Sequence, residues 1–282
     1  MNFEFTKMHH LGNDFIMVDF RKYEDDCCRF RVKFDEVFSP DTVKMLCDRH
    51  FGIGADGVVG VFNPPSKRYD LKMRIINSDG SEAKMCGNGL ACFALFASCT
   101  NAASRRPGAS LRVETLSGPR GASIKKSRGG FSAVLDMGEP VIDFIKDLRI
   151  GKYKFKINSV SMGNPHCVIF LDEPLSDSEF ERLGPVIERH RLFPDKTNVE
   201  FVTVKSRSEI SVQVWERGAG RTLACGTGAS AAAFMAVSYK FCGPRVKVLL
   251  PGGSCRAEIK TGGHVHLECS PVKVFEGNIE LS

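Results

Sequence analysis

Apolar and polar residues alternate in two stretches of the chain, at residues 71–75 and 210–214. Alternation with a period of two is typical of a strand with one buried face. The chain reverses after each stretch, at residues 77–80 and 216–220, which are rich in glycine and polar residues. The pattern therefore predicts two strands that each deliver polar side chains to a turn.

Two further stretches, residues 90–99 and 229–237, are small and apolar on nearly every side. This composition predicts helices that are buried on most sides, as when strands wrap around them. Ser39 and Ser176 carry the signals of helix starts, and Gly184-Pro185 predicts an interruption of the second of these helices. Further strands are expected at 3–8, 15–18, 111–115, 121–126, 131–137, 167–171 and 199–204, and as short strands across 245–275.

These patterns occur in the same order in both halves of the chain. Each half has a Gly-Asn turn, a helix, an alternating strand, a polar turn and a buried helix. A chain of 282 residues is long enough for two cores. The polar turn at 127–130 favours a domain boundary there, with domains at 1–127 and 128–270.

Each predicted buried helix is preceded by the motif Cys-Gly-x-Gly, beginning at Cys86 and at Cys225. A thiol at a helix start lies beside free backbone N–H groups and the positive end of the helix dipole, which lowers a thiol pKa from about 8.5. The glycines also allow the loop to present its N–H groups to a carboxylate. We therefore expect two reactive thiols, each beside an anion-binding helix end.

Two such thiols facing each other across a cleft suit the inversion of a carbon centre. One group removes a proton from one face and the other returns a proton to the opposite face. Two helix ends on a carboxylate help to stabilise the charge that develops. No lysine motif for a cofactor is evident, so no cofactor is expected.

Other interpretations of the same residues remain open at this point. A cysteine before a buried helix can be a packed small residue, and Gly-x-Gly can be a plain helix start in a duplicated fold. The asparagines Asn13, Asn77, Asn164 and Asn198 all fall at turns, which asparagine favours. His264 and His266 alternate on a strand and could bind a metal ion, but no acidic partner is evident nearby, so no metal site is expected.

Composition narrows the classes of protein. The formal charge of +6 is modest and the basic residues are dispersed, which argues against a nucleic-acid partner. No apolar stretch is long enough for a membrane span and no signal-peptide core is present at the N-terminus. The 11 cysteines include the adjacent pair at 27–28 and no Cys-x-x-Cys, which fits a reducing cytoplasm.

Seven segments together resemble the diaminopimelate epimerases, which are cofactor-independent amino-acid epimerases. They are residues 12–15, 49–57, 77–82, 86–89, 162–166, 216–220 and 224–228, and the resemblance runs nearly from end to end. It implies an α/β (α+β) fold of two pseudo-symmetric domains, each a curled mixed sheet around a central helix. It also implies that residues 271–282 return to the first domain, and that the protein is a homodimer.

The resemblance assigns roles to individual residues. It implies that Cys86 and Cys225 are the proton donor and acceptor, and that His166 and Glu216 tune them. The implied substrate contacts are Asn13, Asn77, Gly87, Asn88, Asn164, Asn198, Glu216, Arg217, Gly226 and Thr227. The implied reaction interconverts LL- and meso-diaminopimelate, for lysine and peptidoglycan precursors.

The chain departs from common family patterns at three positions. Ala91 stands where many members have arginine, Arg221 stands where many have an acid, and Gly57 stands where some have glutamine. An insertion around residues 23–35 could reshape the rim of the cleft. Two alternatives follow: another cofactor-independent racemase on the same scaffold, or a non-enzymatic binding protein or related isomerase, against which the presence of both cysteines argues.

Overall fold

The structure is a computed structural model that describes residues 2–24, 33–100, 110–127 and 130–281. The adjacent cysteines at 27–28, most of the loop at 101–110, the middle of the turn at 127–130 and the middle of the insertion at 23–35 lie outside these residues. Among the described residues, no helix combines the length and the apolar character needed to cross a membrane.

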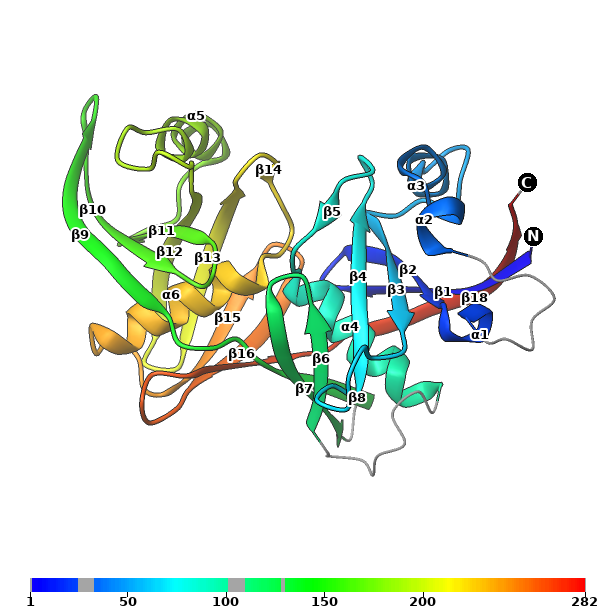
Figure 1. Cartoon of the computed structure of the whole chain (residues 1–282). Helices are drawn as coiled ribbons and strands as arrows, with labels where there is room; N and C mark the ends of the chain where they lie inside the picture. The colour runs from blue at the N-terminus through cyan, green and yellow to red at the C-terminus, as the bar shows by residue number, and fades with distance from the viewer. Residues whose placement is uncertain (1, 25–32, 101–109, 128–129, 282) are drawn as a thin grey trace. The chain divides into compact units, whose positions relative to one another are not determined.

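The chain forms two compact units. The first consists of Met1–Leu135 together with Cys269–Ser282, and the second consists of Asp136–Glu268. The sequence placed the boundaries at 127/128 and 270/271, and that division stays a prediction. Each unit contains one mixed sheet and one long helix that the strands surround (Figure 1).

The sheet of the first unit begins with the last strand of the chain. Its strands follow the order β18, β1, β2, β3, β4, β6, β7, with the short β5 beside β4. β2 and β3, and β4 and β6, are parallel pairs, and the other pairs are antiparallel. The strands are β1 (Asn2–His10), β2 (Asn13–Asp19), β3 (Gly57–Phe62), β4 (Leu71–Asn77), β5 (Glu82–Ala83), β6 (Ser110–Thr115), β7 (Gly118–Ser127) and β18 (Val272–Glu280). β8 (Gly130–Asp136) follows β7 in the chain.

The sheet of the second unit repeats this order and these directions. It runs β9, β10, β11, β12, β13, β15, β16, β17, with the short β14 beside β13. The parallel pairs are again the third with the fourth strand and the fifth with the sixth. The strands are β9 (Val141–Ile150), β10 (Tyr153–Ser161), β11 (Pro165–Leu171), β12 (Asn198–Ser206), β13 (Glu209–Glu216), β14 (Gly220–Arg221), β15 (Arg245–Leu250), β16 (Gly253–Ile259) and β17 (Val265–Cys269).

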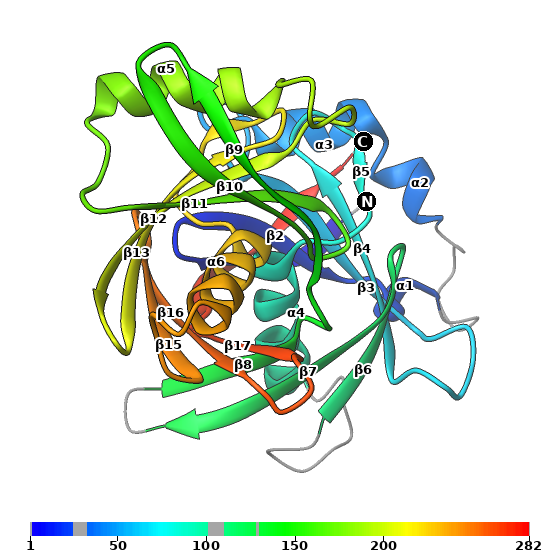
Figure 2. The same cartoon turned by 90° about the vertical axis from the view of Figure 1, so that its left-hand side faces the viewer.

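The central helices are α4 (Gly87–Cys99) in the first unit and α6 (Gly226–Ser238) in the second. Each is 13 residues long and buried over most of its length, because strands lie on several sides of it (Figure 2). The predicted fold class, with a curled mixed sheet around a central helix in each half, is confirmed. The short helices α1 (Arg21–Glu24) and α2 (Phe34–Val37) belong to the first unit.

A second helix lies on the other face of each sheet. α3 (Pro40–Cys47) contacts β3 and β4, and α5 (Asp177–Glu188) contacts β12 and β13. Ser39 caps α3 by accepting a hydrogen bond from the Thr42 amide, and Ser176 forms a capping box with Glu179, as the sequence predicted.

The predicted interruption at Gly184-Pro185 is wrong, because α5 continues through both residues to Glu188. The ring of Trp215 explains the glycine, since a Cβ atom at Gly184 would lie 2.6 Å from Trp215 Cδ2. Phe180, Leu183 and Ile187 bury the same helix face in the core. This tertiary packing outweighs the hydrogen bond that proline removes.

Candidate active site

Cys86 and Cys225 occupy the same position in the two units. Each is the N-cap of its central helix, and each Sγ accepts a hydrogen bond from the amide of the second glycine of the motif, Gly89 or Gly228, at 3.4 Å. The prediction that both cysteines open buried helices is therefore confirmed. The cap places each sulfur at the end of the helix where the backbone N–H groups point outward.

In the first unit, Asn13 joins the thiol to the first turn of α4. Its Oδ1 lies 3.7 Å from Cys86 Sγ and accepts a hydrogen bond from Asn88 Nδ2 at 3.1 Å. Its Nδ2 donates to Asp56 Oδ2 at 2.7 Å, which fixes the orientation of the amide. Asn13, Asn88 and Cys86, which the sequence singled out separately, thus lie together.

His10 continues this chain of hydrogen bonds and was not singled out in the sequence. It is 1% exposed, and its Nδ1 lies 2.9 Å from Asn88 Oδ1. Burial lowers the pKa of the His10 ring, so that the ring is neutral near pH 7 and donates from Nδ1. His10 therefore holds the amide of Asn88 with its Nδ2 toward Asn13.

Asn77 lies apart from this chain. It ends β4, where its Nδ2 donates to Ser81 Oγ at 3.0 Å and its backbone amide donates to the carbonyl of the same serine. Its partner across the ladder is Gly57.

In the second unit, a chain of polar contacts leads from a buried carboxylate to the thiol. His166 Nδ1 lies 2.7 Å from Glu200 Oε1, and His166 Nε2 lies 3.2 Å from Asn164 Oδ1. Asn164 Nδ2 donates to Thr227 Oγ1 at 3.4 Å, and the same hydroxyl lies 3.4 Å from Cys225 Sγ. His166, Asn164, Thr227 and Cys225 are thus brought together, with Glu200 as the member that sequence reasoning missed.

The pKa of the Cys225 thiol differs from the lowered pKa that is expected for a thiol at a helix start. Burial raises the pKa of the Cys225 thiol well above its usual value, and the charges of Glu216 and Glu200 add to the rise. The contacts with Thr227 and the Gly228 amide act in the opposite direction but are weaker. The predicted lowering is wrong for this thiol, because burial next to two carboxylates outweighs the helix dipole.

Glu216 shares this environment. Burial raises the pKa of its carboxyl, its interaction with Cys225 lowers that pKa, and the charge of Glu200 raises it further. The neutral thiol therefore favours ionisation of the carboxyl, whereas the ionised carboxyl opposes ionisation of the thiol.

Hydrogen bonds from backbone amides hold the turn at the end of β13, residues 216–220. Asn198 is 4% exposed, accepts the Arg217 amide on Oδ1 at 2.9 Å and donates from Nδ2 to the Pro165 carbonyl at 2.9 Å. The side chain of Arg217 is exposed and donates to the Asp195 carbonyl. Glu188, which is 2% exposed, receives hydrogen bonds from Trp215 Nε1 and from the Gly218 amide. Asn198 and Glu188 thus anchor the turn that carries Glu216 and Arg217.

No acidic partner was expected for His264, but two carboxylates lie beside its ring. Its Nδ1 lies 3.4 Å from Asp136 Oδ1 and its Nε2 lies 3.0 Å from Glu139 Oε1. The two carboxylates approach opposite edges of the ring, which is not how three ligands converge on one ion. Within the described parts of the chain, no group of three or more His, Cys, Asp or Glu side chains could hold a metal ion.

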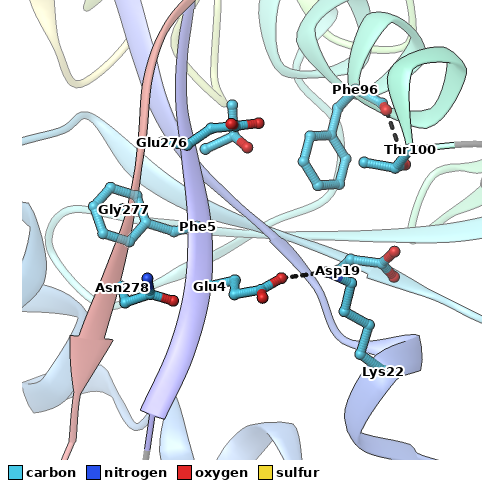
Figure 3. Close-up of a pocket in the computed structure, with 10 residues that line it drawn as sticks. Glu4, Phe5, Asp19, Lys22, Phe96, Thr100, Glu276, Gly277 and Asn278 are labelled. Carbon is cyan, nitrogen blue, oxygen red and sulfur yellow. Dashed lines mark hydrogen bonds and ion pairs between the residues drawn. The ribbon is translucent and has the colours of Figure 1, made fainter.

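A cavity of about 360 Å³ lies in the first unit, between β1, the end of β2, β18 and the C-terminal end of α4 (Figure 3). Phe5 and Phe96 contribute apolar surface, and Glu4 forms an ion pair with Lys22 at its edge. None of the ten residues that line it is a predicted catalytic or substrate-binding residue. We therefore assign no part of the reaction to it.

Comparison with known proteins identifies the family. The family model of diaminopimelate epimerase matches residues 5–142 and 158–278. The chain belongs to the diaminopimelate epimerase family. It is 41% identical to the diaminopimelate epimerase of Desulfitobacterium hafniense over 289 residues, covering 97% of each chain. It is 43% identical to that of Carboxydothermus hydrogenoformans over 294 residues, covering 99% of this chain and all of the relative.

Solved structures share the fold at low sequence identity. A PhzF-family protein of Bacillus anthracis superposes with a TM-score of 0.72 at 14% identity, over the whole of both chains. A hydroxyproline epimerase of Agrobacterium vitis superposes with a TM-score of 0.69 at 13% identity, covering 99% of this chain and 92% of that one. The scaffold of the diaminopimelate epimerase family is thus shared with these proteins.

The structure accounts for the three departures from common patterns of the diaminopimelate epimerase family. Arg221 donates to Asp177 and Glu181, so it ties β14 to the outer helix α5. Ala91 is fully buried inside α4. At Gly57 a Cβ atom would meet the Ile76 carbonyl at 2.6 Å, so close packing of β3 against β4 requires glycine in this backbone arrangement.

Proposed function

We propose that this protein interconverts LL- and meso-diaminopimelate without a cofactor, by two-base epimerisation, in the synthesis of lysine and peptidoglycan precursors in the cytoplasm. The observation that carries the proposal is identity of about 40% to diaminopimelate epimerases along nearly the whole chain. The N-cap position of both cysteines adds the chemical groups that the reaction needs.

The two thiols act as base and acid on opposite faces of one carbon. In one direction the thiolate of Cys86 takes the proton of the substrate α-carbon, the electron pair of the broken C–H bond delocalises into the carboxylate, and the thiol of Cys225 gives a proton to the other face. This leaves a thiol at Cys86 and a thiolate at Cys225, which is the starting state for the reverse direction. The high pKa of Cys225 suits it to be the donor in the free protein.

The substrate carboxylate next to the reacting carbon is bound at the helix ends. Gly87 and Asn88 open α4, and Gly226 and Thr227 open α6, so their backbone N–H groups point outward. These donors stabilise the charge that develops when the proton leaves. Asn13 and Asn164 hold the side chains of Asn88 and Thr227 and contact the substrate beside them.

The second amino-acid head of the substrate is bound by the remaining polar residues. Arg217 is exposed and can form a bidentate pair with a carboxylate. Asn77, Asn198 and Glu216 complete the set, and Glu216 acts together with His166 in setting the protonation of Cys225.

We also propose that the protein is a homodimer. β18 pairs with β1, and three of its apolar side chains, Val272, Val274 and Phe275, are between 45% and 54% exposed. An apolar strand surface of this kind favours burial against another chain.

The assay that tests the function uses purified, reduced protein with LL-diaminopimelate in deuterated water, without added pyridoxal phosphate. We expect meso product that carries deuterium at the inverted α-carbon, because the returned proton comes from a thiol that has exchanged with solvent. Racemisation of another amino acid, together with no product from LL-diaminopimelate, would instead assign the alternative racemase function.

Single variants locate the chemistry in the same assay. Cys86→Ser and Cys225→Ser should each lose most of the turnover, because a hydroxyl is a far weaker base than a thiolate at neutral pH. Cys99→Ser is the matched control, since Cys99 is an exposed residue at the opposite end of α4. Activity near that of the unmodified protein in either of the first two variants would remove that cysteine from the mechanism.

A further inference from the structure

Glu200 is a fully buried carboxylate that lies outside the set of residues assigned to the reaction. Its side chain is 0% exposed and its Oε1 lies 2.7 Å from Nδ1 of His166, which is equally buried. Its Oε2 is buried and has no hydrogen-bond partner among the described residues. A buried charge with an unsatisfied oxygen is costly, so its retention calls for a physical reason.

The carboxylate lies beside the first turn of α6. A Cβ atom at Gly228 would be only 2.5 Å from Glu200 Oε1, so the glycine allows the carboxylate to approach the helix end. Gly228 also donates its amide to the sulfur of Cys225. The positive end of the α6 dipole thus already has a negative neighbour, and a thiolate at Cys225 would be a second one.

The first unit lacks this arrangement. In its parallel pair Phe15 lies opposite Gly57, and in the second unit His166 lies opposite Asn198. Two residues further along the partner strand stand Val59 and Glu200 respectively. The buried His166–Glu200 pair is therefore replaced by the apolar residues Phe15 and Val59, and the two cysteines sit in electrostatically different surroundings.

The charged groups that face Cys225 come from three strands. They are Glu200 on β12, Glu216 on β13 and, through Asn164 and Thr227, His166 on β11. Of the two acids, only Glu200 is fully buried and bound to the histidine, and its Oε1 lies beside Gly228 at the helix end.

We propose that Glu200 is a positioning residue whose buried carboxylate, fixed by His166 beside the first turn of α6, keeps the Cys225 thiol protonated in the free protein. This inference rests on the proposed function and adds to it that Cys225, in the second unit, is the proton donor in the free protein. The same carboxylate fixes the ring of His166 and through it the amide of Asn164.

The test measures the protonation of Cys225 directly, in protein without substrate. Cysteine labelled with carbon-13 at Cβ is titrated by NMR, and the Cys225 signal is assigned by its absence in Cys225→Ser. In Glu200→Gln, which keeps an oxygen for His166 and removes the charge, we expect the midpoint to fall by about one pH unit. The thiolate fraction at a given pH then rises about tenfold.

The matched control is Glu188→Gln, which removes a second buried carboxylate of the same unit that binds Trp215 and Gly218 instead. Its Cys225 titration should follow that of the unmodified protein. If Glu200→Gln folds poorly, the double variant His166→Phe/Glu200→Val, which copies the apolar pair of the first unit, should give the same fall. An unchanged midpoint in the folded Glu200 variants, or an equal fall in Glu188→Gln, would overturn the proposal. Because no substrate is used, the result is separate from the outcome of the diaminopimelate assay.

Discussion

One ring nitrogen of His10, Nε2, is buried and has no hydrogen-bond partner among the described residues. Protonation at that nitrogen would place an uncompensated charge inside the first unit. Burial accordingly lowers the pKa of His10 below its ordinary value of 6.5. The consequence is a dependence of stability on pH that belongs to this single residue.

We expect the unmodified protein to lose stability relative to His10→Asn as the pH falls below 6.5. The unfolded chain binds a proton at His10 in that range and the folded chain does not, so the free energy of unfolding declines by up to about 1.4 kcal/mol per pH unit. Above pH 6.5 the difference between the two proteins should stay constant. The measurement is the urea midpoint between pH 5 and pH 8, and parallel curves over the whole range would contradict the prediction.

At this scale the sequence predicted the members of the site that belong to its repeated motifs. Cys86 and Cys225 are marked by the glycines that follow them, and these local signals survive folding. Glu200 and His10 are not marked by a motif, because each is a single polar residue in a strand and its partner is far along the chain. An isolated acid or histidine meets its partner only when the strands pair, and a local sequence pattern does not predict that pairing.

Among elements, the two central helices begin with the same motif but in different surroundings. At Gly228 an added methyl group would lie 2.5 Å from a buried carboxylate oxygen, whereas at Gly89 its nearest neighbour is Ile75 Cδ1 at 3.1 Å. Ile75 Cδ1 is the far end of a side chain and can move, but the carboxylate is held by His166.

We therefore expect Gly228→Ala to destabilise the protein by about 1–3 kcal/mol, as overpacking in a core does. The equivalent Gly89→Ala should cost less, because the gain in helix propensity of up to about 1 kcal/mol offsets a small shift of Ile75. Urea unfolding of the two variants side by side gives the comparison. A larger loss in Gly89→Ala would show that the helix end in the first unit is the more tightly packed one.

Helix starts were predicted well because caps are local, as with Ser39 and Ser176. The end of α5 was not, since Pro185 alone predicts a break. The helix persists because Trp215, distant in the sequence, packs against Gly184, and the same helix face is buried in the core. Propensity decides an element only where packing does not.

At the scale of the whole molecule, the first unit depends on the end of the chain. β18 pairs with β1 along nearly its full length, and Leu281 belongs to the core of that unit. The equivalent edge strand of the second unit is β9, which precedes the rest of its sheet. The order of elements in each half was predictable from the repeated patterns, but this pairing between the two ends of the chain required the family resemblance.

Removal of residues 271–282 should therefore expose backbone amides of the first unit to solvent and leave those of the second unit protected. We expect amide hydrogen exchange to accelerate in β1 and β2, because β1 loses a partner strand and the core loses Leu281. Peptides from β10 to β13 should retain their protection. Equal loss of protection in both units, measured by mass spectrometry, would indicate that they unfold as one.

The position of β18 has a consequence for synthesis on the ribosome. A chain emerges from its N-terminus, and domains generally fold as they become complete. The first unit, although its other strands are made first, lacks its edge strand until residues 272–280 have left the exit tunnel, while the strands and helices of the second unit are available earlier. The half that carries Cys86 is therefore the later one to mature, and a chain released before its end would contain Cys225 in a complete unit but no complete unit around Cys86.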